Sequence, residues 1–326
     1  MSEHIAIVGA GLSGLLAARE LSTAGHRVRV FDKARGPGGR MATRRRQELA
    51  FDHGAQYFTI RDRRFRQEVD TWLAAGVAAP WAARLVEAGD AETRPHVTEH
   101  DRYVGVPRMS AITRFLSRDR DVVFGTRVQS ISREGTGWRL RAETDDVGHY
   151  DTVLVTTPPE QAVPLLAAAP ELAAVAASVQ SEPCWAVMAA FDRPLAADFD
   201  GAFVRDERLA WAARNNSKPG RPPPEAWVLH GSTAWSRAHA HDSSDEVVAS
   251  LLSAFFDATG LEPQAPSFAT GHRWLLSMAK QPLDAGTLWD STGTLGVCGD
   301  WCRGSRVEGA ALSGFAAADH LLRRTP

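Results

Sequence analysis

The first forty residues constrain the fold of this chain more than any other stretch. An apolar, β-branched run at 5–8 is followed at once by the turn GAGLSG at 9–14 and then by a helical pattern. A second strand pattern over 26–31 ends at Asp32, which lies 18 residues after Gly14. A strand, a glycine turn, a helix, a strand and an acid in this order are the fingerprint of a dinucleotide-binding βαβ unit. The sequence therefore predicts an α/β chain with a Rossmann-type domain at its start.

Each glycine of the turn has a separate physical role in this fingerprint. Gly9 permits the tight turn, Gly11 lets backbone N–H groups approach a pyrophosphate, and Gly14 lets the helix pack closely on the strand. The N-terminus of the helix adds a partial positive charge that favours phosphate oxygens. Asp32 can accept hydrogen bonds from the adenosine ribose. We therefore expect a dinucleotide to bind at this turn.

A second glycine-rich turn, GPGGRM at 36–41, follows the ribose acid within a few residues. It contains Arg40, whose planar guanidinium suits pyrophosphate oxygens. Asp32-Lys33, the GGRM motif and the segment DHGAQYF at 52–58 together resemble the flavin amine oxidase superfamily, and within it most closely the bacterial renalases. This resemblance implies FAD rather than NAD. An NAD-type Rossmann domain with an incidental glycine loop is the alternative.

The resemblance also implies cofactor contacts in the middle and at the end of the chain. By resemblance, Val128 meets the adenine through its backbone and Thr156 ends the second strand that contacts FAD. Asp300 is expected to bind the ribityl chain, and a helix that starts at Val307 to direct N–H groups at the flavin edge that becomes negative on reduction. For non-covalent FAD, the predicted cofactor-binding residues are Gly9, Gly11, Leu12, Ser13, Gly14, Asp32, Lys33, Gly39, Arg40, Met41, His53, Gly54, Ala55, Gln56, Val128, Thr156, Asp300 and Val307.

The length and composition of the chain fit two domains of a globular protein. The chain has 326 residues, of which 44% are hydrophobic and 23% charged. No run is long and apolar enough to span a bilayer, and the glycines within 5–18 fit a buried strand and helix better than a secretory signal. Three cysteines, at 184, 298 and 302, favour a reducing cytoplasm over a disulfide framework. We expect an FAD-binding domain at 1–60, 100–159 and 271–326, and an α+β substrate domain, built on a mainly antiparallel sheet, at 61–99 and 160–270.

The net charge of −2 hides a marked asymmetry. Ten Lys and Arg stand against three acids between Lys33 and Arg66, so this segment carries +7 and the rest of the chain −9. The balancing acidity argues against a nucleic-acid partner. The segment is either a solvated face or a positive field that attracts an anionic substrate. The turn-rich, basic loop at 215–224 is likewise either an exposed connection between strands or a substrate-gating loop.

The sequence contains no Ser-His-Asp spacing, zinc pattern or P-loop, so we expect no metal and assign the chemistry to the flavin. A single dinucleotide fingerprint disfavours a separate NADPH domain. The renalase resemblance implies an oxidase that converts 2- or 6-dihydro-NAD(P) to NAD(P)+ by hydride transfer to flavin N5, with O2 reduced to H2O2. Such a hydride donor needs no general base, because its product cation is aromatic, and the sequence shows no obvious base or other catalytic residue.

Two alternatives stay open at this point. A flavin amine oxidase acting on a small amine would place Lys280 near flavin N5 and enclose the amine with aromatic side chains. A non-catalytic FAD-fold binding protein is the second alternative, disfavoured by the intact phosphate-binding glycines. The sequence does not indicate an oligomeric state. The predicted substrate-pocket residues are Gln56, Tyr57, Asn215, His230, Trp274 and Lys280.

Overall fold

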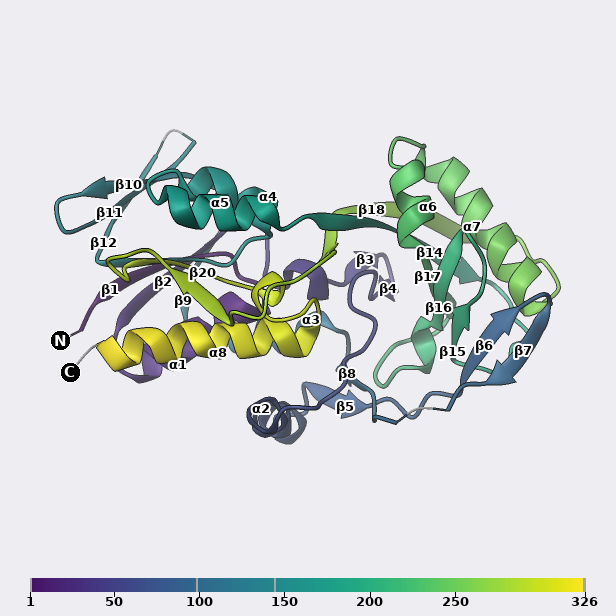
Figure 1. Cartoon of the computed structure of the whole chain (residues 1–326). Helices are drawn as coiled ribbons and strands as arrows, with labels where there is room; N and C mark the ends of the chain where they lie inside the picture. The colour runs from purple at the N-terminus through teal and green to yellow at the C-terminus, as the bar shows by residue number, and fades with distance from the viewer. Residues whose placement is uncertain (1, 98, 144, 325–326) are drawn as a thin grey trace.

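The computed structural model describes residues 2–97, 99–143 and 145–324 and places them around two large sheets (Figure 1). The first sheet has six strands in the order β19-β20-β13-β1-β2-β9, all parallel except for the antiparallel edge strand β19. The predicted βαβ unit is its centre. These strands are β1 (His4–Val8), β2 (Arg27–Asp32), β9 (Asp121–Phe124), β13 (Thr152–Val155), β19 (Thr287–Trp289) and β20 (Leu295–Cys298).

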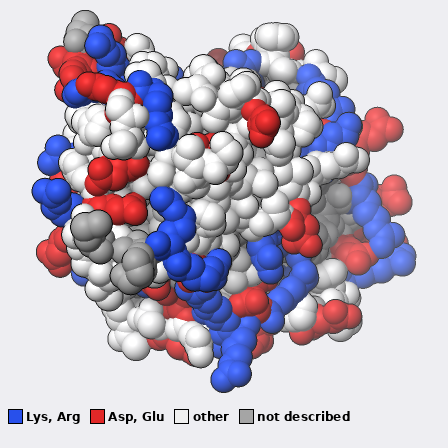
Figure 2. Space-filling view, turned by 60° about the vertical axis from the view of Figure 1, so that its left-hand side comes forward, with Lys and Arg blue, Asp and Glu red and all other residues white. Residues whose placement is uncertain are grey.

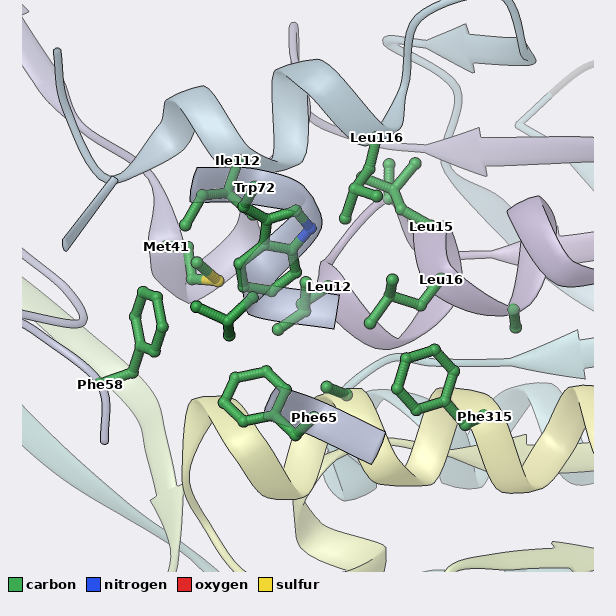
Figure 3. Packing of buried hydrophobic residues seen from close by; sticks show 14 of the residues in the cluster. Leu12, Leu15, Leu16, Met41, Phe58, Phe65, Trp72, Ile112, Leu116 and Phe315 are labelled. Carbon is green, nitrogen blue, oxygen red and sulfur yellow. The ribbon is translucent and has the colours of Figure 1, made fainter. Parts of the chain in front are cut away.

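Alternate side chains of β1 enter two different cores, because successive residues of a strand point to opposite faces. Ile5 and Ile7 lie in the core beneath α1 (Leu12–Thr23) and α8 (Val307–Arg324). The two helices cross closely, since a Cβ on Gly314 would lie 2.4 Å from the carbonyl oxygen of Ser13. Helices α2 (Arg63–Ala74) and α3 (Ser110–Leu116) complete this core, to which they contribute Phe65, Trp72, Ile112 and Leu116 (Figure 3).

The other face of the first sheet is covered by a small antiparallel sheet and by short helices. Trp138 and Leu140 of the small sheet share a core with Val153 of β13 and with Leu166 and Leu172 of the helices. The elements are β10 (Val128–Glu134), β11 (Gly137–Ala142), β12 (Asp146–Tyr150), α4 (Pro159–Ala162), η2 (Val163–Leu166) and α5 (Pro170–Ser178).

The second sheet has seven strands in the order β18-β14-β17-β16-β15-β6-β7, and only the β15–β6 pair is parallel. Helices α6 (Thr233–Ala238) and α7 (Ser244–Thr259) lie beside it (Figure 1), and Leu251 and Phe255 of α7 pack on Trp227 and Leu229 of β17. The predicted α/β class with a mainly antiparallel second sheet is confirmed. The strands are β6 (Leu85–Gly89), β7 (Glu92–Pro95), β14 (Ser181–Phe191), β15 (Gly201–Val204), β16 (Leu209–Arg214), β17 (Glu225–Gly231) and β18 (Phe268–Ala279).

The boundary between the two parts runs elsewhere than the sequence suggested. Residues 159–178 and 63–74, expected in the substrate domain, bury their apolar side chains in the two cores of the first sheet. Conversely, residues 271–279 were expected in the FAD-binding domain but belong to β18 and pair with β14 of the second sheet. The long strands β14 and β18 thus reach from one part of the molecule to the other (Figure 1).

Short elements connect these layers and form much of the wall of the site described below. They are η1 (Gly39–Met41), β3 (Arg44–Arg46), β4 (Leu49–Phe51), β5 (Ala78–Pro80), β8 (Tyr103–Gly105), η3 (Asn215–Ser217) and η4 (Asp300–Cys302). Within the described ranges, the helices are too short or too polar to cross a bilayer.

Candidate functional site

A cavity of about 1610 Å³ lies between the two sheets and exceeds the roughly 300–1,000 Å³ of an ordinary small-molecule pocket. Its lining includes residues at or just after the carboxyl ends of β1, β2, β13 and β20, namely Gly9, Asp32, Thr156 and Gly299. Ligands of open α/β sheets bind at this edge, where the chain order of the strands reverses. The cavity is therefore large enough, and correctly placed, for a dinucleotide together with a second ligand.

The glycine turn at 9–14 forms one wall of this cavity. Gly9 has a φ of +120°, and a Cβ there would lie 2.4 Å from Thr156 Oγ1. A Cβ on Gly14 would lie 2.1 Å from the carbonyl oxygen of Gly9, so this glycine is required by the helix–strand contact itself. Gly11 differs, because a Cβ there would meet no protein atom within 4 Å and would instead enter the cavity. The absence of a side chain at Gly11 thus leaves space for a ligand against the backbone of the turn.

The start of α1 suits an anion. Gly11 is its N-cap and offers no side chain to satisfy the first N–H groups of the helix, while Leu12 and Ser13 line the cavity. Asp32 lies next to this turn, and its two carboxylate oxygens each accept a 2.7 Å hydrogen bond, from the N–H groups of Ala10 and Ala34. These bonds orient the carboxylate and leave it lone pairs for ribose hydroxyls.

Arg40 and Asp300 come together in the structure, although the sequence analysis assigned them to separate parts of the cofactor. Arg40 donates two hydrogen bonds to the Asp300 carboxylate, at 2.8 and 2.6 Å, and a third to the carbonyl oxygen of Ser277 at 3.2 Å. Both side chains line the cavity. Because a guanidinium has five N–H donors, Arg40 keeps two of them for a ligand. The donor set therefore fits a pyrophosphate with a polyol beside it.

Most of the other predicted residues also lie on the cavity wall. His53 and Gly14 do not, and they act behind it. A Cβ on Gly54 would lie 2.0 Å from the carbonyl oxygen of Arg40, so this glycine is needed where the chain passes η1. The predicted residues that line the cavity are Gly9, Gly11, Leu12, Ser13, Asp32, Lys33, Gly39, Arg40, Met41, Gly54, Ala55, Gln56, Tyr57, Val128, Thr156, His230, Trp274, Asp300 and Val307.

The second-sheet end of the cavity is defined here as the part lined by residues 54–58, by side chains of the second sheet, and by His96, Val97, Glu99, His100 and Arg102. It is rich in planar side chains. Tyr57 packs 5.5 Å from the Trp211 ring, and the guanidinium of Arg102 lies 4.9 Å from the Tyr57 ring centre. Phe203 also lines this end and packs 4.7 Å from Trp211. The sequence analysis named only Tyr57 of these, because Phe203 and Trp211 lie in strands, and Arg102 in a connection, that carried no motif.

His230, which lines the second-sheet end, and His53, which lies behind the cavity wall, are both held neutral. The carbonyl oxygen of His53 accepts hydrogen bonds from Trp274 Nε1 at 3.0 Å and from His230 Nε2 at 3.1 Å. Burial is the main cause that lowers the pKa of His53 to about 3 and that of His230 to about 4. Both imidazoles are therefore uncharged at neutral pH, and His230 uses its donor N–H on the protein.

Two predicted pocket residues do not line the cavity. Lys280 is exposed just beyond β18, and its backbone N–H bonds to the carbonyl oxygen of Gln180. Asn215 is buried, where its side chain accepts from the N–H of Asp52 at 3.2 Å and donates to the carbonyl oxygen of Ala50 at 2.7 Å. Asn215 therefore links two chain segments to each other. Neither Lys280 nor Asn215 forms part of the cavity wall.

The loop at 215–224 contains a buried charge cluster that the sequence analysis did not find. Arg221 forms an ion pair with Asp52, and Lys218 donates a 2.9 Å hydrogen bond to Gln56 Oε1 while lying 3.9 Å from Asp52. Burial is the main cause that lowers the pKa of Lys218 to about 7. Burial alone would raise the pKa of Asp52, but Arg221 and Lys218 outweigh it and lower that pKa. An exposed, basic connection is therefore the wrong description of Lys218 and Arg221.

Comparison with protein families gives two matches. A model described as an NAD(P)-binding Rossmann-like domain matches residues 7–71, and one described as flavin containing amine oxidoreductase matches residues 59–322.

Curated relatives match only at short segments. An L-amino-acid oxidase of Daboia russelii is 56% identical over 43 residues, which are 13% of this chain and 8% of that protein. A 4,4'-diapophytoene desaturase of Staphylococcus haemolyticus is 41% identical over 58 residues, or 18% of this chain and 12% of that protein. These matches thus span about a tenth of the relatives' length.

Solved structures match over the whole chain but at low identity. A crystal structure titled as a protoporphyrinogen oxidase from Exiguobacterium sp. 255-15 has a TM-score of 0.77, 14% identity, and 100% coverage of both chains. Wild-type putrescine oxidase bound to putrescine has a TM-score of 0.73 and 14% identity, and the match covers 99% of this chain and 100% of that one. At this identity the likeness establishes the fold alone.

Proposed function

Because the chain belongs to the flavin containing amine oxidoreductase family, and is therefore a flavin-dependent oxidoreductase, we propose that it oxidises isomeric dihydro-NAD(P) to NAD(P)+. The hydride of such an isomer is on ring carbon 2 or 6. In this proposal FAD is held without a covalent bond and O2 accepts the electrons. FAD, when bound, supplies the two-electron acceptor at N5 of its ring. The protein residues bind, orient and enclose the reactants.

The residues that would hold FAD divide by the part of the molecule they face. The N-terminus of α1 and the two free donors of Arg40 suit the pyrophosphate, and Asp32 suits the ribose. Asp300 lies beside Arg40 and offers a carboxylate to hydroxyl groups. The start of α8 at Val307 lines the cavity and directs a positive helix end toward it.

The charge of the second-sheet end is the observation on which the substrate proposal depends. Arg102 and Arg273 contribute two positive charges there, and among the described residues of this end Glu99 is the one carboxylate. Planar rings alternate with these arginines. Such a lining suits a planar heterocycle that carries phosphates. Lys218 and Arg221 do not add to it, because Asp52 and Gln56 hold them behind the wall.

The basic segment from Lys33 to Arg66 contributes less than its composition suggested. Of its ten cations, only Lys33, Arg40 and Arg61 line the cavity. Arg64 is paired instead with Asp319 at 2.6 Å. Figure 2 shows that basic side chains gather toward the lower part of one face with acidic ones interspersed among them. We therefore attribute the attraction of an anionic substrate to the cavity lining rather than to a uniformly positive face.

The neutral histidines are consistent with a reaction that needs no proton transfer from carbon or nitrogen. A dihydronicotinamide ring becomes aromatic when it loses a hydride, so no base has to act. His53 and His230, with pKa values of about 3 and about 4, stay uncharged near pH 7 and are weak proton acceptors. What the protein must supply is a fixed, dry position for the ring, and Tyr57, Trp211 and Trp274 offer flat surfaces for it.

A small amine is the second candidate substrate, and one observation favours it. The same aromatic side chains can enclose an uncharged amine, as they can a nicotinamide ring. The arginines of the second-sheet end disfavour it, because an amine is an ammonium ion in bulk water at neutral pH. Lys280, the lysine expected near the flavin in this alternative, lies outside the cavity.

Anaerobic mixing of the flavin-loaded protein with each substrate class tests the proposal. We expect 2- or 6-dihydro-NAD(P) to bleach the visible flavin band in a single turnover and primary amines to leave it unchanged. Added salt should slow the bleaching at subsaturating substrate, since exposed charges are screened over roughly 8 Å at physiological ionic strength. Rapid bleaching by amines, with none by the dihydronicotinamide isomers, would replace our proposal with the amine oxidase.

A matched pair of arginine variants sharpens this test. Arg273→Gln removes a cavity charge, and we expect it to raise the KM for the dinucleotide by about tenfold or more, the equivalent of one charged hydrogen bond. A dihydronicotinamide without phosphates should be unaffected by the change. Arg94→Gln on the exposed strand β7 is the control and should leave both substrates unchanged. Equal losses for both substrates would show that Arg273 does not contact phosphates.

A further inference from the structure

The buried charges behind Gln56 do not cancel. Lys218 and Arg221 share one carboxylate, Asp52, and the three side chains are between 0% and 1% exposed. When Lys218 is protonated, the cluster therefore carries a net charge of +1. A buried charge without a counter-ion is costly unless some other group benefits from it.

Lys218 reaches the cavity through one hydrogen bond. Its ammonium group donates to Gln56 Oε1 at 2.9 Å, and Gln56 lines the cavity whereas Lys218 does not. The amide nitrogen of Gln56 donates to the carbonyl oxygen of Asp52 and lies 3.4 Å from that of Gly54. Acceptors on one side and an ammonium on the other leave a single orientation for the Gln56 amide. Lys218 thus fixes what Gln56 presents to a ligand.

We propose that Lys218 is a positioning residue for the bound flavin, which fixes Gln56 and adds an uncompensated positive charge that stabilises the negative charge gained by the ring on reduction. Gln56 is one of the predicted cofactor-binding residues, and by the family resemblance we expect the flavin ring to begin beside its segment, 52–58. The proposal rests on flavin binding and not on which substrate reduces the flavin. Its test is therefore separate from the substrate test above.

The size of the effect follows from Coulomb's law for a charge that lies one side chain behind the cavity wall. A unit charge acting across roughly 8–10 Å at an effective dielectric constant of about 20 changes an equilibrium by about tenfold or more. The effect must also depend on pH, because the pKa of Lys218 is lowered to about 7, mainly by burial, with Asp52 raising it and Arg221 lowering it further.

Other charged or titratable groups face Lys218 from three segments. They are Asp52, which stays ionised, the guanidinium of Arg221, and His230, which stays neutral with a pKa of about 4. Among the described residues of this cluster, Lys218 is thus the group whose charge changes between pH 6 and pH 9. The stabilisation of the reduced flavin by Lys218 should be largest at pH 6 and should be lost by pH 9.

The reduction potential of the FAD-loaded protein measures this directly. We expect Lys218→Met to lower the ratio of reduced to oxidised flavin at a fixed potential by about tenfold at pH 6, which is about 30 mV for a two-electron couple. The two proteins should agree at pH 9. Lys280→Met, the same change at an exposed lysine outside the cavity, should match the wild type throughout. No difference at pH 6, or an equal difference at every pH, would overturn the proposal.

A second variant decides the question if Lys218→Met does not retain its flavin. Gln56→Glu keeps a partner for Lys218 but cancels its charge, so we expect a lowered potential at pH 6 that persists at pH 9, where the new carboxylate is still ionised. An unchanged or raised potential in Gln56→Glu would refute the electrostatic role of Lys218.

Discussion

Replacing the buried Lys218 should change how the stability of the protein depends on pH. The Lys218 side chain is 0% exposed, and burial lowers its pKa to about 7. In the unfolded chain the same group has an ordinary lysine pKa of about 10.4. The folded protein therefore releases the proton of Lys218 at a pH where the unfolded chain still binds it.

The sign of the effect follows from this proton difference. Where the unfolded state binds more protons, the free energy of unfolding rises with pH, by about 1.4 kcal/mol per pH unit for one full proton. For Lys218 the difference is about half a proton at pH 7 and nearly one at pH 8–9. The wild type should therefore gain about 2 kcal/mol between pH 7 and pH 9 relative to a variant that has no titrating group at this position.

Urea unfolding of the flavin-free wild type and of Lys218→Met at pH 7, 8 and 9 provides the measurement. Other groups titrate in both proteins. The quantity of interest is therefore how the difference between the two free energies of unfolding, evaluated at a common m-value, changes with pH. Lys280→Met, at an exposed lysine, is the matched control and should run parallel to the wild type. If the wild type and Lys218→Met also run parallel, Lys218 keeps its proton in the folded state and the reasoning fails.

Two further predictions concern the nucleotide-binding end of the cavity. Gly11→Val should fold normally but purify without colour, because the new side chain enters only the ligand space, whereas Gly9→Val should fail to fold, since a Cβ there would lie 2.4 Å from Thr156 Oγ1 at a φ of +120°. Soluble yield and flavin absorbance distinguish the two, and a yellow Gly11→Val protein would contradict the assigned phosphate site. Asp32→Ala should weaken FAD binding by about ten- to hundredfold, the equivalent of one charged hydrogen-bonding group, as measured by flavin fluorescence titration. An unchanged affinity would show that Asp32 serves only the backbone of Ala10 and Ala34.

The centre of the fold was predictable because its determinants are local. The βαβ unit lies within the first 32 residues, where Gly9 has a positive φ, Gly11 borders the ligand space and Gly14 packs against a residue of the same turn. Gly14, for example, is required by the carbonyl oxygen of Gly9. Such short-range constraints leave a readable pattern in the sequence.

The assignment of the helices to domains could not be read in the same way. Residues 159–178 show only that they are helical and partly apolar, and an apolar helix face does not indicate which sheet will cover it. In the structure Leu166 and Leu172 share a core with Trp138, which belongs to the small sheet over the first domain. That contact depends on the path of the whole chain.

The loop at 215–224 shows why the composition of a segment can mislead about its burial. Prolines, glycines, asparagines and cations are typical of exposed turns, because a buried loop leaves polar groups without water. Here partners from distant segments replace the water. Asp52 and Gln56, more than 160 residues earlier, hold Arg221 and Lys218, and Trp81 Nε1 donates to Ser217 Oγ at 3.1 Å. In the Asp52–Arg221 and Gln56–Lys218 pairs, one residue lies in the segment that passes along the cavity wall and the other lies between β16 and β17. These two contacts therefore also fix the second sheet against that wall. The buried charges of Asp52, Lys218 and Arg221, which the sequence analysis did not predict, thus set the shape of the second-sheet end.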